Sequence, residues 1–299
     1  MLKSVKLNRK AFAFLLVLFA LVFAGCLDWL NGSASVNLQG GVVNVSGSLG
    51  VNGNASFNAS GVQQGVLSVI PSNLSACFYG NENERFSGNF FGNFSAMGKT
   101  VFIQSKWVNA STSNDSFAGC AVIVLLDDDE GRYLERAERE KVSRELAKGA
   151  GLIVIGEGGA LSQLDGSIYG WDAGMAGVVP AIITGPGKDA MPLGRHVLSG
   201  IFAPTKTDPA FNGIGRFHFD GWQVVEALPV RGSDVIATAK EREEPSSPSY
   251  PAIIRLNTPL RNTAYYFSYN VLDTPQVLFN AVRFQSQQYL YLFFLRAGR

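Results

Sequence analysis

The chain has 299 residues, of which 46% are hydrophobic and 16% are charged, and its formal net charge is +1. This length accommodates one large domain or two small ones, and the apolar fraction is sufficient for a sizeable core. Because there is no basic excess to neutralise phosphates, the composition argues against nucleic acid as a partner.

The first 26 residues are typical of a signal sequence. Four basic residues lie between positions 3 and 10, residues 11–24 are almost wholly apolar, and Gly25-Cys26 follows. The apolar run is short for a membrane-spanning helix and suits a signal peptide. Its end resembles a lipoprotein processing site, which predicts cleavage before Cys26 and a lipid on the Cys26 sulfur. The alternative is an N-terminal anchor that is never cut. Both place the remaining chain outside the cytoplasm, attached to a membrane.

Residues 27–64 are rich in Asn, Gly and Ser. They hold too little apolar surface for an independent core, so they are expected to form a flexible stalk with at most a loose hairpin. Asn-x-Ser sequons begin at Asn31, Asn44, Asn54, Asn58, Asn73, Asn93, Asn109 and Asn114, and none begins later. Because Asn-x-Ser is the acceptor sequence for N-glycosylation, these sequons indicate that the protein is a glycoprotein. The alternative is that a segment rich in Asn and Ser produces sequons by chance.

The folded domain is expected to span residues 65–299 and to be built around residues 120–156. Two uninterrupted apolar runs, residues 120–126 and 151–155, suit strands buried on both faces of a parallel sheet. Residues 132–148 between them are rich in good helix formers, with Gly149 at the end as a cap. The pattern predicts one strand–helix–strand crossover unit.

Further elements follow from the apolar pattern and from turn residues. A helix is expected to follow Thr274, with Pro275 at its first position. Residues 72–97 carry no clear pattern. Strands are expected at residues 66–70, 100–108, 181–184, 223–228, 234–239, 252–256 and 264–269. The order predicts an α/β fold with additional antiparallel hairpins near the C-terminus.

Six segments carry a further signal through their order along the chain: residues 116–127, 149–156, 195–201, 251–254, 264–268 and 280–283. Together they resemble the class I glutamine-amidotransferase-like superfamily, and more narrowly its extracytoplasmic and trehalose-utilisation-type branch. The resemblance covers about residues 65–285 and rests on the order of the matches. It implies a flavodoxin-like three-layer sandwich with a mainly parallel sheet and added antiparallel strands.

Catalytic members of this superfamily carry a Cys nucleophile on a tight strand-to-helix turn, completed by a His and an acid. The equivalent turn here is residues 156–159, where Glu157 and Gly158 replace the nucleophile region. The resemblance therefore implies a non-catalytic domain that binds a ligand or a protein partner, with Glu157 and Gly158 as candidate ligand-binding residues.

Three consecutive acids, Asp127, Asp128 and Asp129, follow the first central strand. One interpretation is that they stabilise the N-terminus of the following helix. Because they also lie at the carboxyl edge of the expected sheet, Asp127 and Asp128 are candidate ligand-binding residues. The alternative is a hydrolase or a metal-dependent enzyme that uses Asp127, Asp129 and Glu157. Neither a metal nor a cofactor is expected.

Only three cysteines occur: Cys26, Cys77 and Cys120. Outside the cytoplasm, with Cys26 lipidated, an oxidising setting would favour a Cys77–Cys120 disulfide. The alternative is two buried free thiols. Three aromatic residues, Tyr169, Trp171 and Trp222, could stack on a sugar, and the alternative is that they pack in a local core. The expected partner is therefore a protein or a carbohydrate, in addition to the membrane.

Overall fold

A computed structural model describes the following parts of the chain: residues 34–39, 42–49, 53–60, 70–80, 92–96, 99–108, 117–126, 134, 136–158, 171, 175, 177–185, 193–242, 246–258 and 261–297. Residues 34–60 are described by their backbone alone. The predicted signal peptide with Cys26, the predicted domain start at residue 65, and residues 66–69 of the strand predicted at residues 66–70 lie outside these parts.

The chain divides into two compact units, each described separately below. The first comprises Met1–Asn73, Asn93–Phe102 and Leu290–Arg299, and the second comprises Leu74–Gly92 and Ile103–Tyr289. The first unit contains three strands within the expected stalk: β1 (Ala34–Gln39), β2 (Val42–Leu49) and β3 (Gly53–Ser60). They form an antiparallel sheet in the order β1-β2-β3. The segment therefore has a regular backbone, and its role as a stalk stays a prediction.

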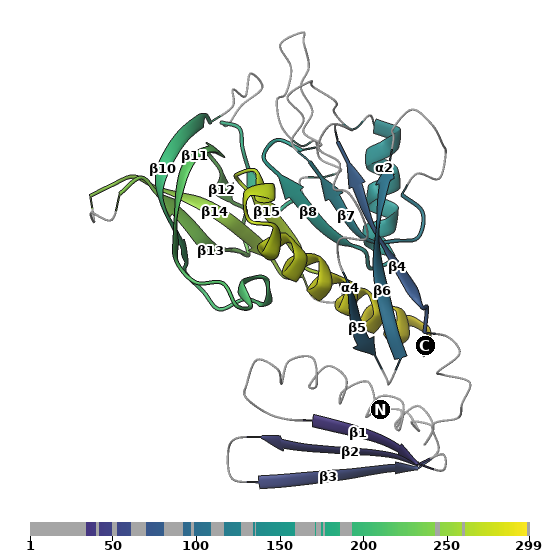
Figure 1. Cartoon of the computed structure of the whole chain (residues 1–299). Helices are drawn as coiled ribbons and strands as arrows, with labels where there is room; N and C mark the ends of the chain where they lie inside the picture. The colour runs from purple at the N-terminus through teal and green to yellow at the C-terminus, as the bar shows by residue number, and fades with distance from the viewer. Residues whose placement is uncertain are drawn as a thin grey trace, which may run out of the picture. The chain divides into compact units, whose positions relative to one another are not determined.

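A large mixed sheet forms the framework of the second unit (Figure 1). Its strand order is β11-β10-β13-β14-β15-β8-β7-β4-β6-β5, with β5 and the first part of β6 in the first unit. The strands are β4 (Asn73–Tyr79), β5 (Asn93–Ala96), β6 (Lys99–Val108), β7 (Cys120–Leu125), β8 (Gly151–Ile155), β10 (Arg195–Pro204), β11 (Phe217–Val225), β13 (Ser233–Lys240), β14 (Ser249–Leu256) and β15 (Ala264–Phe267). Two short strands, β9 (Ala181–Ile182) and β12 (Leu228–Pro229), pair separately. The helices are α2 (Arg136–Ala147), α4 (Pro275–Ala297) and the 3-10 turns η3 (Pro209–Phe211) and η4 (Val271–Asp273).

Three parallel pairs lie at the centre of this sheet. Strands β4, β7, β8 and β15 are parallel neighbours. Strands β14, β13, β10 and β11 continue from β15 in antiparallel pairs. The α/β class is therefore correct, but the sheet is mixed, with many antiparallel strands, and not clearly flavodoxin-like. The expectation of a mainly parallel sheet underestimated the antiparallel strands that follow residue 193.

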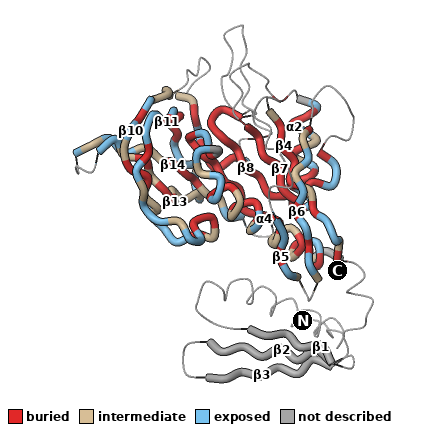
Figure 2. The backbone as a smooth tube through the Cα atoms, viewed as in Figure 1, coloured by how far each residue is buried: buried red, intermediate tan, exposed pale blue. Residues whose placement is uncertain are grey.

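Helices α2 and α4 pack on opposite faces of the central strands. Every residue of β7 and β8 is buried, as their unbroken apolar sequences predict (Figure 2). Leu146 of α2 shares a core cluster with Leu152 and Val154 of β8. On the other face, a Cβ at Gly151 would lie 2.6 Å from the Gln285 side chain of α4. Alternation along β8 thus directs successive residues to the two helices.

The antiparallel strands enclose a second, aromatic core. Trp222 of β11 stacks on Phe219 and on Tyr269, with both ring centroids 4.3 Å away. An isolated bridge between Val224 and Tyr269 brings β11 back to the segment after β15, so the sheet curls at this end. Trp222, a candidate sugar-stacking residue in the sequence, is only 7% exposed and belongs to this core.

Candidate functional site

The turn after β8 lies where the sequence predicts a sharp bend. Gly156 has a φ of +55°, a conformation that glycine adopts without steric cost. The Gly156 N–H donates to the Phe267 carbonyl at 2.7 Å, and the Gly158 N–H donates to the Ile155 carbonyl at 2.8 Å. The chain therefore reverses within three residues and presents the intervening Glu157 at the carboxyl edge of the parallel strands.

Gly158 is fixed by packing against the end of β7. A Cβ at this position would lie 2.4 Å from the Leu125 carbonyl oxygen and 2.7 Å from that of Leu126. Only glycine permits this approach. The backbone contact accounts for Gly158 without a ligand, although a ligand-binding role stays a prediction.

Glu157 forms an ion pair with Arg195, the first residue of β10. The Arg195 Nε donates to Glu157 Oε1 at 3.0 Å, and the two side chains are 25% and 10% exposed. The Arg195 Nη1 also donates to Gln223 Oε1 of β11, at 3.4 Å. The nearly buried carboxylate is thus compensated by a guanidinium that is itself oriented by the neighbouring strand.

Trp171 covers the same turn from a different segment. Its indole N–H donates to the Gly158 carbonyl at 3.2 Å, and its ring meets Tyr266 of β15 edge-on, with centroids 5.8 Å apart. The half-buried ring of Trp171 therefore packs against the turn and β15. Its role as a sugar-stacking residue stays a prediction.

Neither histidine completes a triad with Glu157. His196 Nε2 lies 3.3 Å from Glu226 Oε2, and the His196 ring packs on Tyr250 at 4.6 Å. His218 lies on β11, opposite Ile201 of β10. In the described part of the chain no hydrogen bond joins Glu157 to a histidine, so the hydrogen-bonded relay of a nucleophile triad is not formed there.

Cys77 and Cys120 are joined by a disulfide between the adjacent strands β4 and β7. Their Cα atoms are 5.8 Å apart, within the range that a disulfide spans, and both residues are fully buried. Because a bonded sulfur cannot act as a thiolate nucleophile, neither residue offers a reactive thiol in this structure.

Asp127, Asp128 and Asp129 lie outside the described residues, so their roles stay predictions. Within the described ranges, no three His, Cys, Asp or Glu side chains are grouped so that they could hold a metal ion. The site that can be built therefore consists of Glu157, Arg195, Gln223 and Trp171.

The five sequon asparagines within the described residues all lie in the first unit. Asn44 lies on β2 and Asn54 and Asn58 lie on β3, whereas Asn31, Asn109 and Asn114 lie outside the described parts. Asn73 and Asn93 are the exposed first residues of β4 and β5. Their exposure is compatible with modification, which itself stays a prediction.

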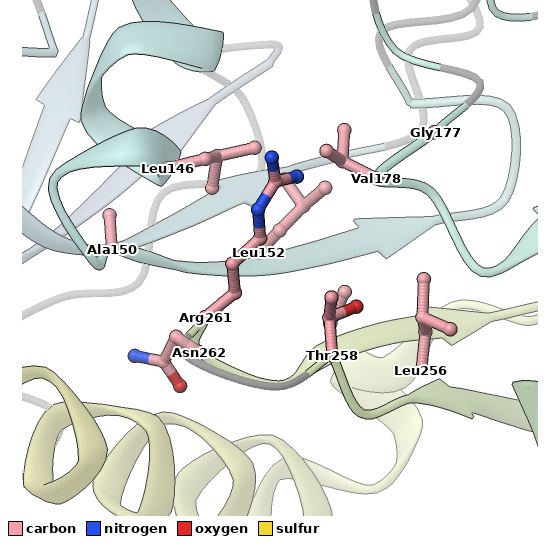
Figure 3. A pocket seen from close by; sticks show the side chains of 10 residues that line it. Leu146, Ala150, Leu152, Gly177, Val178, Leu256, Thr258, Arg261 and Asn262 are labelled. Carbon is pink, nitrogen blue, oxygen red and sulfur yellow. The ribbon is translucent and has the colours of Figure 1, made fainter. Parts of the chain in front are cut away.

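A small pocket with a cavity volume of about 20 Å³ lies at the opposite, amino-terminal edge of β8 and β15 (Figure 3). Leu146, Leu152, Val178 and Leu256 form its apolar wall, and Arg261 extends over it. No predicted site residue lines it. Because α/β sheets bind ligands at their carboxyl edge, this pocket is separate from the candidate site.

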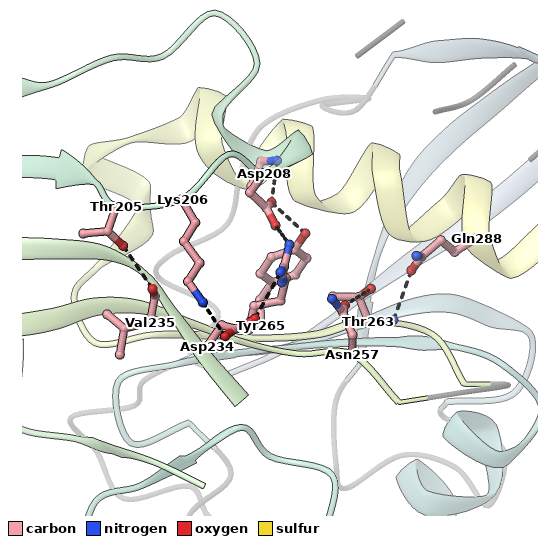
Figure 4. A network of polar contacts seen from close by, with 11 residues as sticks. Thr205, Lys206, Asp208, Asp234, Val235, Asn257, Thr263, Tyr265 and Gln288 are labelled. Carbon is pink, nitrogen blue, oxygen red and sulfur yellow. Dashed lines mark hydrogen bonds and ion pairs between the residues drawn. The ribbon is translucent and has the colours of Figure 1, made fainter. Parts of the chain in front are cut away.

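A buried polar network in the antiparallel strands was not predicted (Figure 4). Asp208 accepts hydrogen bonds from Arg255 at 2.6 Å, from the Tyr265 hydroxyl at 2.9 Å and from the Ala210 N–H at 2.8 Å. Arg255 also contacts Asp234, which pairs with Lys206 at 2.5 Å. The network connects η3 to β13, β14 and β15, and the Arg255 guanidinium compensates the buried Asp208 charge, while the buried Arg255 Nε itself makes no hydrogen bond to any described residue.

Comparisons with known proteins give weak structural likenesses. No protein-family model and no curated protein matches the chain. A cytoplasmic protein from Salmonella typhimurium is 14% identical, covers 71% of this chain and 98% of its own, and has a TM-score of 0.44. ThuA-like proteins from Bacteroides uniformis and Parabacteroides merdae are each 10% identical, cover 71% of this chain and 91% and 88% of their own, and have TM-scores of 0.45 and 0.41. At this level of similarity we draw no conclusion from them.

None of the helices in the described residues is both long and apolar enough to cross a membrane.

Proposed function

We propose that this chain is a membrane-anchored, extracytoplasmic protein whose glutamine-amidotransferase-like domain binds a partner without catalysing a reaction. The observation that carries the proposal is the Glu157–Arg195 ion pair at the turn after β8. In the catalytic proteins that the sequence resembles, this turn presents a thiol. Here it presents a carboxylate whose charge is already engaged by a guanidinium.

The chemistry of the turn supports binding over nucleophilic catalysis. A carboxylate attacks amides poorly, and one oxygen of Glu157 already accepts a hydrogen bond from Arg195. The disulfide between Cys77 and Cys120 removes the two thiols that lie within the described strands. The arrangement is suited to recognition, because Glu157 and Gln223 hold the partly exposed Arg195 guanidinium at the edge where α/β sheets bind ligands.

The same disulfide supports an extracytoplasmic location. Disulfides persist in oxidising compartments and are rare in a reducing cytosol. Together with the signal-like first 26 residues, it is consistent with export and lipid attachment at Cys26. Metabolic labelling with a fatty acid tests the anchor, and equal labelling of the wild type and Cys26→Ser would contradict it.

Photo-crosslinking tests whether this edge binds a partner. Gln223 is exposed and lies beside Arg195, so a benzophenone amino acid at position 223 would sample the site. In native membranes we expect a discrete adduct that is lost when Glu157→Lys is added. The same probe at Arg231, an exposed turn residue, is the matched control. Equal adducts at both positions would contradict binding at this edge, whether the partner is a protein or a carbohydrate-bearing molecule.

A further inference from the structure

The three-stranded sheet of the first unit has two chemically different faces. In its register, Asn44 of β2 lies opposite Asn37 of β1 and Asn58 of β3. Val45 lies opposite Val36 and Phe57 in the same way. Because neighbouring residues of a strand alternate between faces, Asn and Ser positions share one face, and the Val, Leu, Ala and Phe positions other than Val42 share the opposite face.

The two outer strands carry none of the charges that commonly protect a sheet edge. No charged residue occurs between Asp28 and Glu82. In the described residues, β1 and β3 each pair with β2 alone, so each has one edge without a strand partner. Soluble proteins usually place Lys, Pro or a bulge on such an edge to prevent pairing with another chain. Neither a proline nor a charge interrupts β1 or β3.

The sequence of β3 is symmetric in character about Phe57. Ser56 and Asn58 flank it, followed outward by Ala55 and Ala59 and then by Asn54 and Ser60. Two copies of β3 that pair antiparallel about Phe57 would place small apolar positions opposite one another. They would also place Asn opposite Ser on the polar face. A two-fold symmetric contact requires this kind of self-complementary strand.

We propose that β3 is a homodimerisation edge, at which two copies of this chain form a continuous six-stranded sheet in the order β1-β2-β3-β3-β2-β1. The partner is a second copy of the chain, because antiparallel pairing of two β3 strands about Phe57 matches apolar positions on one face and polar positions on the other. Strand β1 is the less suitable edge, since it has six residues against eight in β3 and therefore forms a shorter ladder. This proposal is independent of the binding site at Glu157.

Cysteine crosslinking of the full-length purified chain tests the register. At the two-fold axis Phe57 faces its own copy, and opposed Cα atoms of antiparallel strands lie about 4.5–5.5 Å apart, which a disulfide can bridge. Phe57→Cys should therefore give a covalent dimer under mild oxidation. Val36→Cys is the matched control, because Val36 and Phe57 flank the same residue, Val45, on opposite edges. The unsubstituted chain controls for its natural cysteines.

Lysine variants provide a second measurement by light scattering. Phe57→Lys places like charges opposite each other at the axis and should raise the dimer dissociation constant by at least about tenfold. Val36→Lys perturbs the same ladder within one copy and should leave the dimer intact. The proposal is overturned if the unsubstituted chain is monomeric. The proposal is also overturned if Val36→Cys gives more covalent dimer than Phe57→Cys. A third contradicting result is that both lysine variants are monomeric and Phe57→Cys gives no covalent dimer.

Discussion

Arg195 Nε donates a 3.0 Å hydrogen bond to Glu157 Oε1, and this contact joins the turn after β8 to the first residue of β10. It connects the parallel centre of the sheet to its antiparallel part. It also determines the chemistry of the turn, because the Glu157 carboxylate, the charged side chain of the turn, is already paired with the Arg195 guanidinium. Glu157 and Arg195 are 38 residues apart in sequence, so no local spacing pattern predicts that they form a pair.

Removing the guanidinium should destabilise the fold. Arg195→Ala leaves the nearly buried Glu157 carboxylate without its cation, and we expect a loss of about 1–3 kcal/mol in the free energy of unfolding. Adding Glu157→Gln should recover part of that loss. Urea denaturation at neutral pH measures both. Arg231→Ala, at an exposed position, is the control and should change stability by less than about 0.5 kcal/mol. Equal stabilities of Arg195→Ala and the control would contradict the ion pair.

The disulfide should make stability depend on reductant. It closes a loop with a sequence separation of 43, for which chain entropy predicts about 4 kcal/mol of stabilisation. We expect the midpoint of unfolding to fall when the wild type is reduced under denaturing conditions. A variant with Cys77→Ala and Cys120→Ala should unfold at the same lower midpoint with or without reductant. Two alkylatable thiols at these positions in the unreduced protein would refute the disulfide.

Gly200 of β10 should not tolerate a side chain. A Cβ there would lie 1.9 Å from the Lys240 carbonyl oxygen, where the register with β11 shifts between Leu198 and Gly200. Gly200→Ala should therefore destabilise the protein by about 1–3 kcal/mol, as overpacking does. Gly215→Ala is the control, since a Cβ there meets nothing within 4 Å. Similar melting temperatures for the two variants would show that β10 and β13 are not paired in this way.

Alkaline pH should destabilise the antiparallel part through its buried tyrosines. Burial raises the pKa of the Tyr265 hydroxyl well above its usual range, and the Asp208 carboxylate raises it further. The unfolded chain loses this proton near pH 10 whereas the folded chain keeps it, so stability should fall as pH rises above about 10. The slope is at most about 1.4 kcal/mol per pH unit for one group.

Tyr265→Phe tests this dependence, since it removes the titrating group. Its urea midpoint should change less between pH 9 and pH 11 than that of the wild type, although the variant is less stable at neutral pH because Asp208 loses a hydrogen bond. Tyr269→Phe should flatten the curve in the same direction, since burial also raises the pKa of Tyr269. Unchanged slopes in both variants would contradict the burial of these hydroxyls.

The sequence predicted the elements whose signals are local. The unbroken apolar runs of β7 and β8 and the Thr274-Pro275 start of α4 led directly to the observed elements. Strand β4 was not assigned, because it starts at the polar, exposed residue Asn73 and so lacks a clear apolar start. The burial of the rest of β4 depends on its pairing with β7, which the local sequence does not reveal. Strand β10 was missed because it begins with Arg195 and contains Gly200, which needs its neighbour β13 to be explained.

The candidate site was predicted only where glycines mark it. The glycines around Glu157 indicated a turn after β8, and the turn is present. Its partner Arg195 lies on a strand that the apolar pattern did not reveal. The sequons show a related ambiguity. Asn44 and Ser46 of β2 are two residues apart, which is both the spacing of a sequon and the side-chain period of a strand. A strand with alternating polar residues can therefore contain a sequon without being glycosylated.

The central claim is that the turn after β8 holds no nucleophile, and release of ammonia from glutamine tests it most directly. The full-length chain, purified in detergent, should release no more ammonia than the heat-denatured protein, with or without reductant. Ammonia release that iodoacetamide abolishes would contradict the account, because Cys77 or Cys120 would then have to act as a free thiolate rather than as half of a buried disulfide.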